Sequence, residues 1–234
     1  MPVAKNTKSA DIRNPLEYTV EFLKKLEKNN TKTWFNENRD YYEASWLFPA
    51  QELVLNLGEE LRTISPHIVA LPKIDQTIFR IYRDVRFSKN KQPFKTHLGL
   101  FFWEAGRNKN ESAGYYFHIE RSLLILAAGT YIFPKDILLK YRKVVSDPKK
   151  AAELLKLHKS LEKKGYKIGG KNLKKIPRGY QSETATEALL FTGMDVFLEL
   201  KPVPADIFKD TEKFAMSHYK KMQPMFQWLV DNLY

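Results

Sequence analysis

The chain contains no cysteine among its 234 residues. This absence excludes disulfide bonds, thiolate nucleophiles, and zinc or iron–sulfur sites with cysteine ligands. Long apolar runs are also missing, because the longest, such as LLILAAG at 123–129, are far too short to span a bilayer. The first residues lack the apolar segment of a signal peptide. We therefore expect a cytoplasmic protein with no membrane association.

Several catalytic and phosphate-binding motifs are absent as well. The sequence has no GxxxxGK[ST], GxGxxG, GxSxG or HExxH pattern, and it points to no particular cofactor. What the chain has in excess is positive charge, with 39 Lys and Arg against 27 Asp and Glu, a net charge of +12. Such an excess favours anionic partners, either phosphorylated or carboxylated small molecules or nucleic acid. Solubility alone is the simpler alternative.

Helical patterns lie at both ends of the chain. Apolar residues recur every three or four positions after Asn14-Pro15, and the first 65 residues predict three helices. Further helices are expected over 134–145, 148–164 and 182–191. A last helix is expected from about 204 to the C-terminus, bent or broken near Pro224.

The middle of the chain is rich in strand-forming residues. FRIYRDVRF, HLGLFFW, YYFHIE and SLLILAAGTYI predict four strands, and their short connections favour an antiparallel meander. FLELKP predicts a further short strand, and GYKIGGKNLKKIPRGY predicts a loop. We therefore predict the α+β class: one domain over 14–234, with N- and C-terminal helices flanking the sheet, preceded by a flexible tail over 1–13.

The segment FRIYRDVRFSKNKQPFKTH at 79–97 is the first candidate site. Guanidinium groups bind phosphate or carboxylate in a bidentate manner, so its cations predict an anion-binding surface. If the segment is a strand, Arg83 falls on the apolar face, where it needs a partner; Glu37 or Glu43 would make that pairing structural. The ligand-binding candidates here are Arg80, Tyr82, Arg83, Arg86, Lys95 and His97.

The second candidate is GYYFHIE, where alternation puts Tyr116, His118 and Glu120 on one face of a strand. His97 lies close to them if the two strands pair. His118 is then the candidate for proton transfer, with Glu120 as its orienting partner. A hydrogen-bonded surface histidine is an equal alternative. Two histidines and a glutamate also suit a metal, but the surrounding positive charge leads us to expect none.

A third candidate is the basic loop ending in IPRGY. It contains no acid, and Arg178 in it is placed to close over an anion bound on the sheet. The alternative is an ordinary solvated loop, the usual environment of a lysine run.

At these residues the sequence resembles the family called domain of unknown function 2461. FRIYRDVRFSKNKQPFKTH resembles its longest motif, and NNTKTWFNENRDYYE, GYYFHIE and IPRGY resemble others in the same order, over about 16–233. Asn90 stands where the family usually has aspartate, and Phe94 replaces tyrosine. The resemblance implies a single α+β domain and no established activity.

Two functions follow as hypotheses, beside the alternative of a structural or interaction protein whose arginines are all internally paired. In the first, the protein binds a phosphate- or carboxylate-bearing small molecule and is an enzyme or a binding protein. This hypothesis requires the candidate side chains to share one concave pocket. In the second, the protein is a nucleic-acid-binding module without catalysis. That hypothesis requires a basic groove with Tyr82 or Tyr116 exposed for base stacking.

Overall fold

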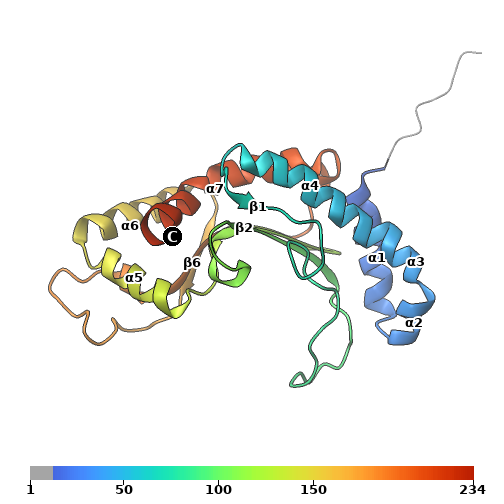
Figure 1. The fold of residues 1–234 in the computed structure, drawn as a ribbon, viewed down its shortest axis with the longest axis horizontal. Coiled ribbons are helices and arrows are strands. Elements are labelled where there is room, and N and C mark those ends of the chain that lie inside the picture. The colour runs from blue at the N-terminus through green and yellow to red at the C-terminus, as the bar shows by residue number, and fades with distance from the viewer. Residues whose placement is uncertain (1–12) are drawn as a thin grey trace, which may run out of the picture.

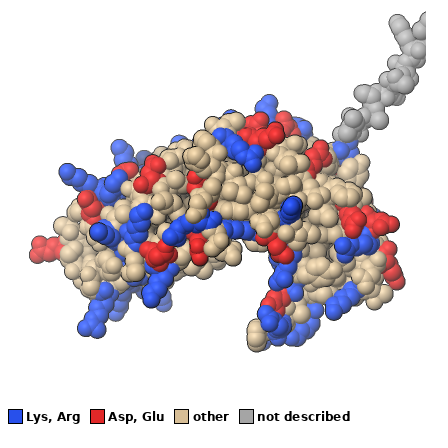
Figure 2. All heavy atoms as spheres, viewed as in Figure 1, with Lys and Arg blue, Asp and Glu red and all other residues tan. Residues whose placement is uncertain are grey.

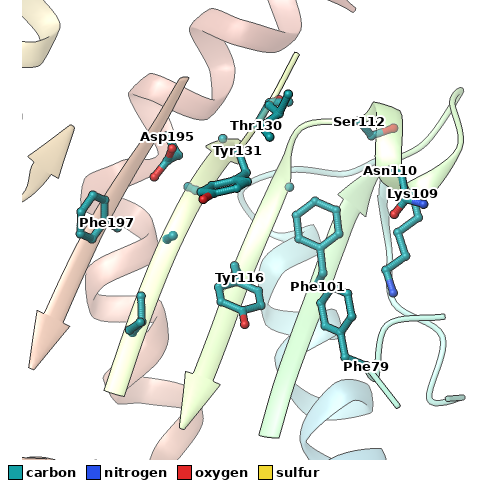
Figure 3. A pocket seen from close by; sticks show the side chains of 16 residues that line it. Phe79, Phe101, Lys109, Asn110, Ser112, Tyr116, Thr130, Tyr131, Asp195 and Phe197 are labelled. Carbon is teal, nitrogen blue, oxygen red and sulfur yellow. The ribbon is translucent and has the colours of Figure 1, made fainter. Parts of the chain in front are cut away.

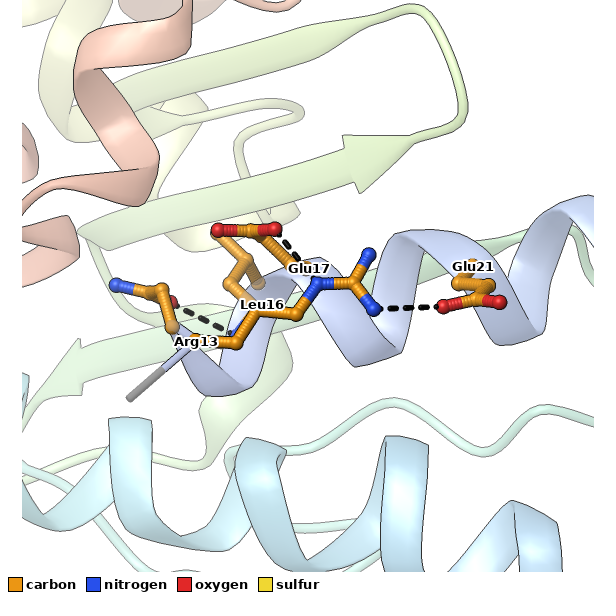
Figure 4. A network of polar contacts seen from close by, with 5 residues as sticks. Arg13, Leu16, Glu17 and Glu21 are labelled. Carbon is orange, nitrogen blue, oxygen red and sulfur yellow. Dashed lines mark hydrogen bonds and ion pairs between the residues drawn. The ribbon is translucent and has the colours of Figure 1, made fainter. Parts of the chain in front are cut away.

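The computed structural model describes residues 13–234. The tail predicted for 1–13 therefore lies outside the described residues, apart from Arg13. Arg13 contacts Glu17 at 2.8 Å and Glu21 at 3.0 Å on the first helix, α1 (Pro15–Lys28) (Figure 4). The Asn14 side chain accepts a hydrogen bond from the Leu16 amide, so the predicted N-cap is confirmed.

A long helical segment follows in pieces: α2 (Lys32–Glu37), α3 (Arg39–Tyr42), a π-helical turn (Glu43–Leu47) and α4 (Phe48–Arg62). The π turn lies next to Pro49, which has no N–H to donate to the carbonyl of Ser45. The Thr19 hydroxyl donates to that carbonyl instead, at 2.9 Å. The irregular turn is therefore fixed by a contact with α1.

The sheet has six strands in the order β1-β2-β3-β4-β6-β5, and every neighbouring pair is antiparallel. The α+β prediction is confirmed, with six strands rather than about four. The strands are β1 (Ile68–Val69), β2 (His97–Glu104), β3 (Gly114–Glu120), β4 (Leu124–Thr130), β5 (Lys167–Lys171) and β6 (Phe191–Leu200).

The remaining helices are α5 (Lys135–Val145), α6 (Pro148–Lys163) and α7 (Thr211–Leu233). Short 3-10 turns cover Lys109–Glu111, Glu187–Leu190 and Ala205–Phe208. Figure 1 shows α4 and α7 on one side of the sheet, while no helix of residues 13–234 crosses the middle of the other side. Within the same residues, no helix is both long and apolar enough to cross a membrane.

Three local predictions were wrong. FRIYRDVRF is not a strand; residues 79–95 form an irregular hairpin, called here the basic hairpin, with one isolated bridge between Tyr82 and Phe94. Its alternation does not correspond to burial, since Phe87 on the supposed apolar face is 95% exposed. The predicted helix over 182–191 is reduced to a 3-10 turn, and the predicted loop begins with strand β5. In addition, α7 continues through Pro224 without a break.

The basic hairpin is held at its base by buried Asn30. The Asn30 side chain donates to the Phe94 carbonyl and accepts from the Phe94 amide, both at 3.0 Å. The Phe94 ring stacks on Phe35 with centroids 4.2 Å apart. The α1–α2 connection therefore determines where the hairpin leaves the sheet.

We expect Asn30→Ala to lower the free energy of unfolding by about 3 kcal/mol, because it leaves a buried N–H and a buried carbonyl without partners. Urea denaturation measures the change. Asn29→Ala is the matched control, because the Asn29 side chain is exposed and donates to the Lys25 carbonyl, one helical turn away. A similar loss in both variants would contradict a specific role for Asn30.

Candidate functional site

The side of the sheet away from α7 is called here the open face. Strand register aligns one row of its side chains across four strands, Phe101, Tyr116, Ala127 and Phe197. The alternate residues, such as Leu126 and Val196, are buried in the core. Period-2 geometry therefore gives the open face its own set of side chains.

A pocket of about 600 Å³ lies on this face, and Figure 3 shows aromatic rings along its floor. Glycines on two of the strands leave room for this pocket. A Cβ on Gly114 would lie 2.6 Å from the Phe101 ring, and Gly129, with φ of +131°, would place a Cβ 2.2 Å from the Met194 carbonyl. The close approach of the neighbouring strands therefore requires glycine at both positions.

Two lysines lie near the Phe79 ring at one end of the pocket; Lys109 belongs to the pocket lining and Lys95 lies outside it. The Lys109 Nζ is 4.0 Å from the centroid of the Phe79 ring and also donates to the Gln76 carbonyl. The Lys95 Nζ is 5.6 Å from the same centroid. Burial lowers the pKa of both ammonium groups. No carboxylate within residues 13–234 forms an ion pair with either lysine, so both remain available to an anion.

Asp195 lines the pocket at β6, on the side away from Phe79 (Figure 3). Its Oδ1 atom is buried, and no hydrogen-bond partner for it occurs in the described part of the chain. Gly169 on β5 makes room for the carboxylate, since a Cβ there would lie 2.5 Å from Oδ1. Burial raises the pKa of Asp195 to about 6.

The histidine cluster expected if the strands of His97 and His118 pair is present beside the pocket. His97 pairs with Glu120 in the β2–β3 register, and the His97 and His118 rings stack with centroids 4.3 Å apart. The His118 ring bonds the Tyr116 hydroxyl through Nδ1 at 2.9 Å and Glu120 through Nε2 at 3.0 Å. Burial, with His118 and Lys95 nearby, lowers the pKa of His97 to about 3. His97 is therefore neutral at physiological pH.

The arginines of the basic hairpin do not line the pocket. Arg83 donates to the Gln92 carbonyl at 3.0 Å and to the Ser88 hydroxyl, so neither Glu37 nor Glu43 is its partner. Arg86 is exposed and forms an ion pair with Asp84 at 2.7 Å. Arg80 is exposed too.

Tyr82 and Arg178 also lie outside the pocket lining. Tyr82 packs its ring against Phe35 and Phe94 and is 45% exposed. Arg178 is exposed in the loop over 172–186. Of the sequence candidates, Tyr116 lines the pocket. His97, His118 and Glu120 form a cluster next to Tyr116, and Lys95 lies near the Phe79 ring. Tyr82, Arg178 and the three hairpin arginines belong neither to the lining nor to this cluster.

The basic hairpin projects beside the open face. Figure 2 shows a hollow next to it, with Lys and Arg gathered at the hairpin and on the far side of the hollow. In Figure 1 the loop over 172–186 (orange) lies on that far side, below α5. The open face is therefore recessed between two basic segments.

Two residues of the site were not predicted from the sequence. Asp195 lies in FTGMDVFLEL, where strict alternation puts an acid on the same face as Phe197, a signal that was available. Lys109 lies in the polar loop EAGRNKNESAG, where no periodic pattern indicates which side chain turns back over the sheet.

The fold and the site define an α+β protein with a one-sided antiparallel sheet and an aromatic pocket on its uncovered face. Residues 18–228 match the family described as "Conserved hypothetical protein (DUF2461)", and the chain belongs to that family. No curated protein and no solved structure matches the chain.

The raised pKa of Asp195 predicts a pH-dependent stability. Between its ordinary pKa of 3.8 and about 6, the folded chain keeps a proton that the unfolded chain releases. Stability is therefore lost as pH rises through this window, by up to about 3 kcal/mol.

We expect Asp195→Asn to remove this loss. Its free energy of unfolding relative to the wild type should increase from pH 4 to pH 7, measured by urea denaturation at both pH values. A difference that is equal at the two pH values would show that the Asp195 carboxyl titrates as an ordinary group.

Proposed function

We propose that the protein binds a small organic anion with a flat, apolar body in the open-face pocket. The observation that carries this proposal is the pairing of an aromatic floor with two cations at one end. Phe101 and Tyr116 are directly opposite each other on adjacent strands, and Lys109 and Lys95 lie at the Phe79 end. Apolar walls with few polar groups are typical of small-molecule sites.

The ligand's orientation follows from the charges. A phosphate or carboxylate group is placed at Lys109, where partial burial strengthens a charge-assisted hydrogen bond. A hydroxyl or amino group is placed at Asp195, because the buried Oδ1 lacks a donor among residues 13–234. The proposed ligand therefore has an anionic group at one end and a hydrogen-bond donor at the other.

The pocket is also placed for acid–base chemistry. Tyr116 lines the pocket, and its hydroxyl contacts the His118 ring, which in turn contacts Glu120. Asp195 supplies a carboxyl group whose pKa of about 6 is near the range used by general bases. These groups support proton transfer to or from a bound molecule as the reaction class for an enzymatic activity.

Single-stranded nucleic acid is a second candidate ligand. The specific observation in its favour is the recess between the basic hairpin and the loop over 172–186 (Figure 2), on the face whose pocket contains Tyr116 and Phe101 (Figure 3). Aromatic rings on a sheet can stack with bases while basic edges contact phosphates.

We expect one or more flat anions to raise the melting temperature of the wild-type protein at fixed ionic strength. The panel contains aromatic carboxylates, mononucleotides, coenzyme A, aliphatic dicarboxylates and short oligonucleotides. A ligand at 100 times its Kd adds about 2.7 kcal/mol of stability. Lys109→Gln should weaken binding of a small anion about tenfold or more, measured by calorimetry.

Lys89→Gln is the matched control, because it removes the same charge from the exposed part of the basic hairpin. A small anion in the pocket loses affinity only in Lys109→Gln. An oligonucleotide following the recess loses affinity in both variants and binds less tightly as salt increases. Equal affinity of wild type and Lys109→Gln for every small anion would refute the pocket proposal.

A further inference from the structure

We propose that His97, His118 and Glu120 bind one divalent transition-metal ion of the zinc class. The three side chains are brought together by strand register, since His97 lies opposite Glu120 and His118 lies opposite Gly99. Their ligand atoms all lie within 4.8 Å of one another. Among residues 13–234, these three side chains form the cluster with suitable spacing for a metal ion. The inference does not depend on the pocket binding an anion.

The distances suit a shared metal. Zinc bonds to histidine nitrogen and carboxylate oxygen are about 2.0–2.2 Å, so two ligand atoms in a tetrahedral site lie about 3.3 Å apart. His118 Nε2 and Glu120 Oε1 are already 3.0 Å apart. The other ligand atoms lie no more than 4.8 Å apart. A rotation of the His97 side chain that moves its nitrogen by about 1.5 Å brings them to the distance of a tetrahedral site.

The orientations of the two histidine rings also suit metal binding. The Tyr116 hydroxyl contacts Nδ1 of His118 and fixes the ring with Nε2 toward Glu120. A hydrogen bond on the far nitrogen is the usual support of a metal-binding histidine. The His97 ring stacks on the His118 ring with centroids 4.3 Å apart, which holds its nitrogens next to the other two ligands.

The charges nearby narrow the choice of ion. The sequence places many cations around these residues, but Arg83 and Arg86 are bound within the basic hairpin to Gln92, Ser88 and Asp84. Lys95 is the cation that acts on His97. A positive neighbour and a single carboxylate disfavour Ca²⁺ and Mg²⁺, which need several oxygen ligands. Two imidazoles favour zinc and its first-row neighbours.

Three protein ligands leave a fourth position for water or another molecule, the arrangement seen in catalytic rather than structural zinc sites. Tyr116 belongs to both environments: its ring lines the pocket and its hydroxyl orients His118. A metal here would lie at the border of the pocket.

The test uses the untagged full-length protein, stripped with chelator and then titrated with ZnCl₂ by calorimetry, and with CoCl₂ by visible absorption. We expect one equivalent of each ion per chain. Glu120→Gln is nearly isosteric and His97→Ala removes a ligand; each should weaken binding at least a hundredfold. Tyr116→Phe, a change in a positioning residue, should weaken binding about tenfold.

His67→Gln is the matched control, because His67 is exposed and lies outside the cluster. It should bind one equivalent with wild-type affinity, and circular dichroism of every variant checks the fold. Failure of the wild type to take up either ion overturns the proposal. So does stoichiometric uptake that survives in both Glu120→Gln and His97→Ala, or that falls equally in His67→Gln. Loss of the metal leaves the Lys109 titrations unaffected as a separate test of the pocket.

Discussion

In the described part of the chain, helices cover only one side of the sheet, and the rest of the structure depends on this constraint. Because side chains alternate along a strand, the residues that pack on α7 leave the intervening ones on the open face. The Tyr219 hydroxyl donates to the Tyr116 carbonyl at 2.8 Å and so fixes α7 to the back of β3, the strand that carries His118 and Glu120. Core packing and site geometry are therefore set by opposite faces of the same strands.

The positively charged side chains near the open face form two sets with different surroundings. The arginines of the basic hairpin are exposed or satisfied by groups of the hairpin itself, as Arg86 is by Asp84. Lys109 and Lys95 instead lie against an aromatic ring in partly desolvated surroundings. Under the proposed function, the first set supplies a long-range field that draws anions toward the recess, and the second supplies short contacts to the bound anion. The count of basic residues alone does not distinguish these roles.

Periodicity predicted the elements in which one face is buried, and it failed where burial does not follow the chain. Alternation placed Tyr116, His118 and Glu120 on one face of a strand, but the approach of His97 to His118 depended on the β2–β3 pairing, which the sequence left open and the structure shows. FRIYRDVRF alternates equally well, yet its position is set by Asn30, 64 residues from Phe94, which no local pattern reveals. Lys109 was missed for the same reason, since a loop has no period.

The floor of the pocket has a consequence for divergence within a family. Ala127 occupies the aligned row between Tyr116 and Phe197, and its side chain faces away from the core. A larger residue at this position would shorten the space between the two rings without touching any group that packs on α7. Sequence drift on one side of a strand can therefore reshape ligand preference while the other side preserves folding, so members of one fold can acquire different ligands independently of their stability.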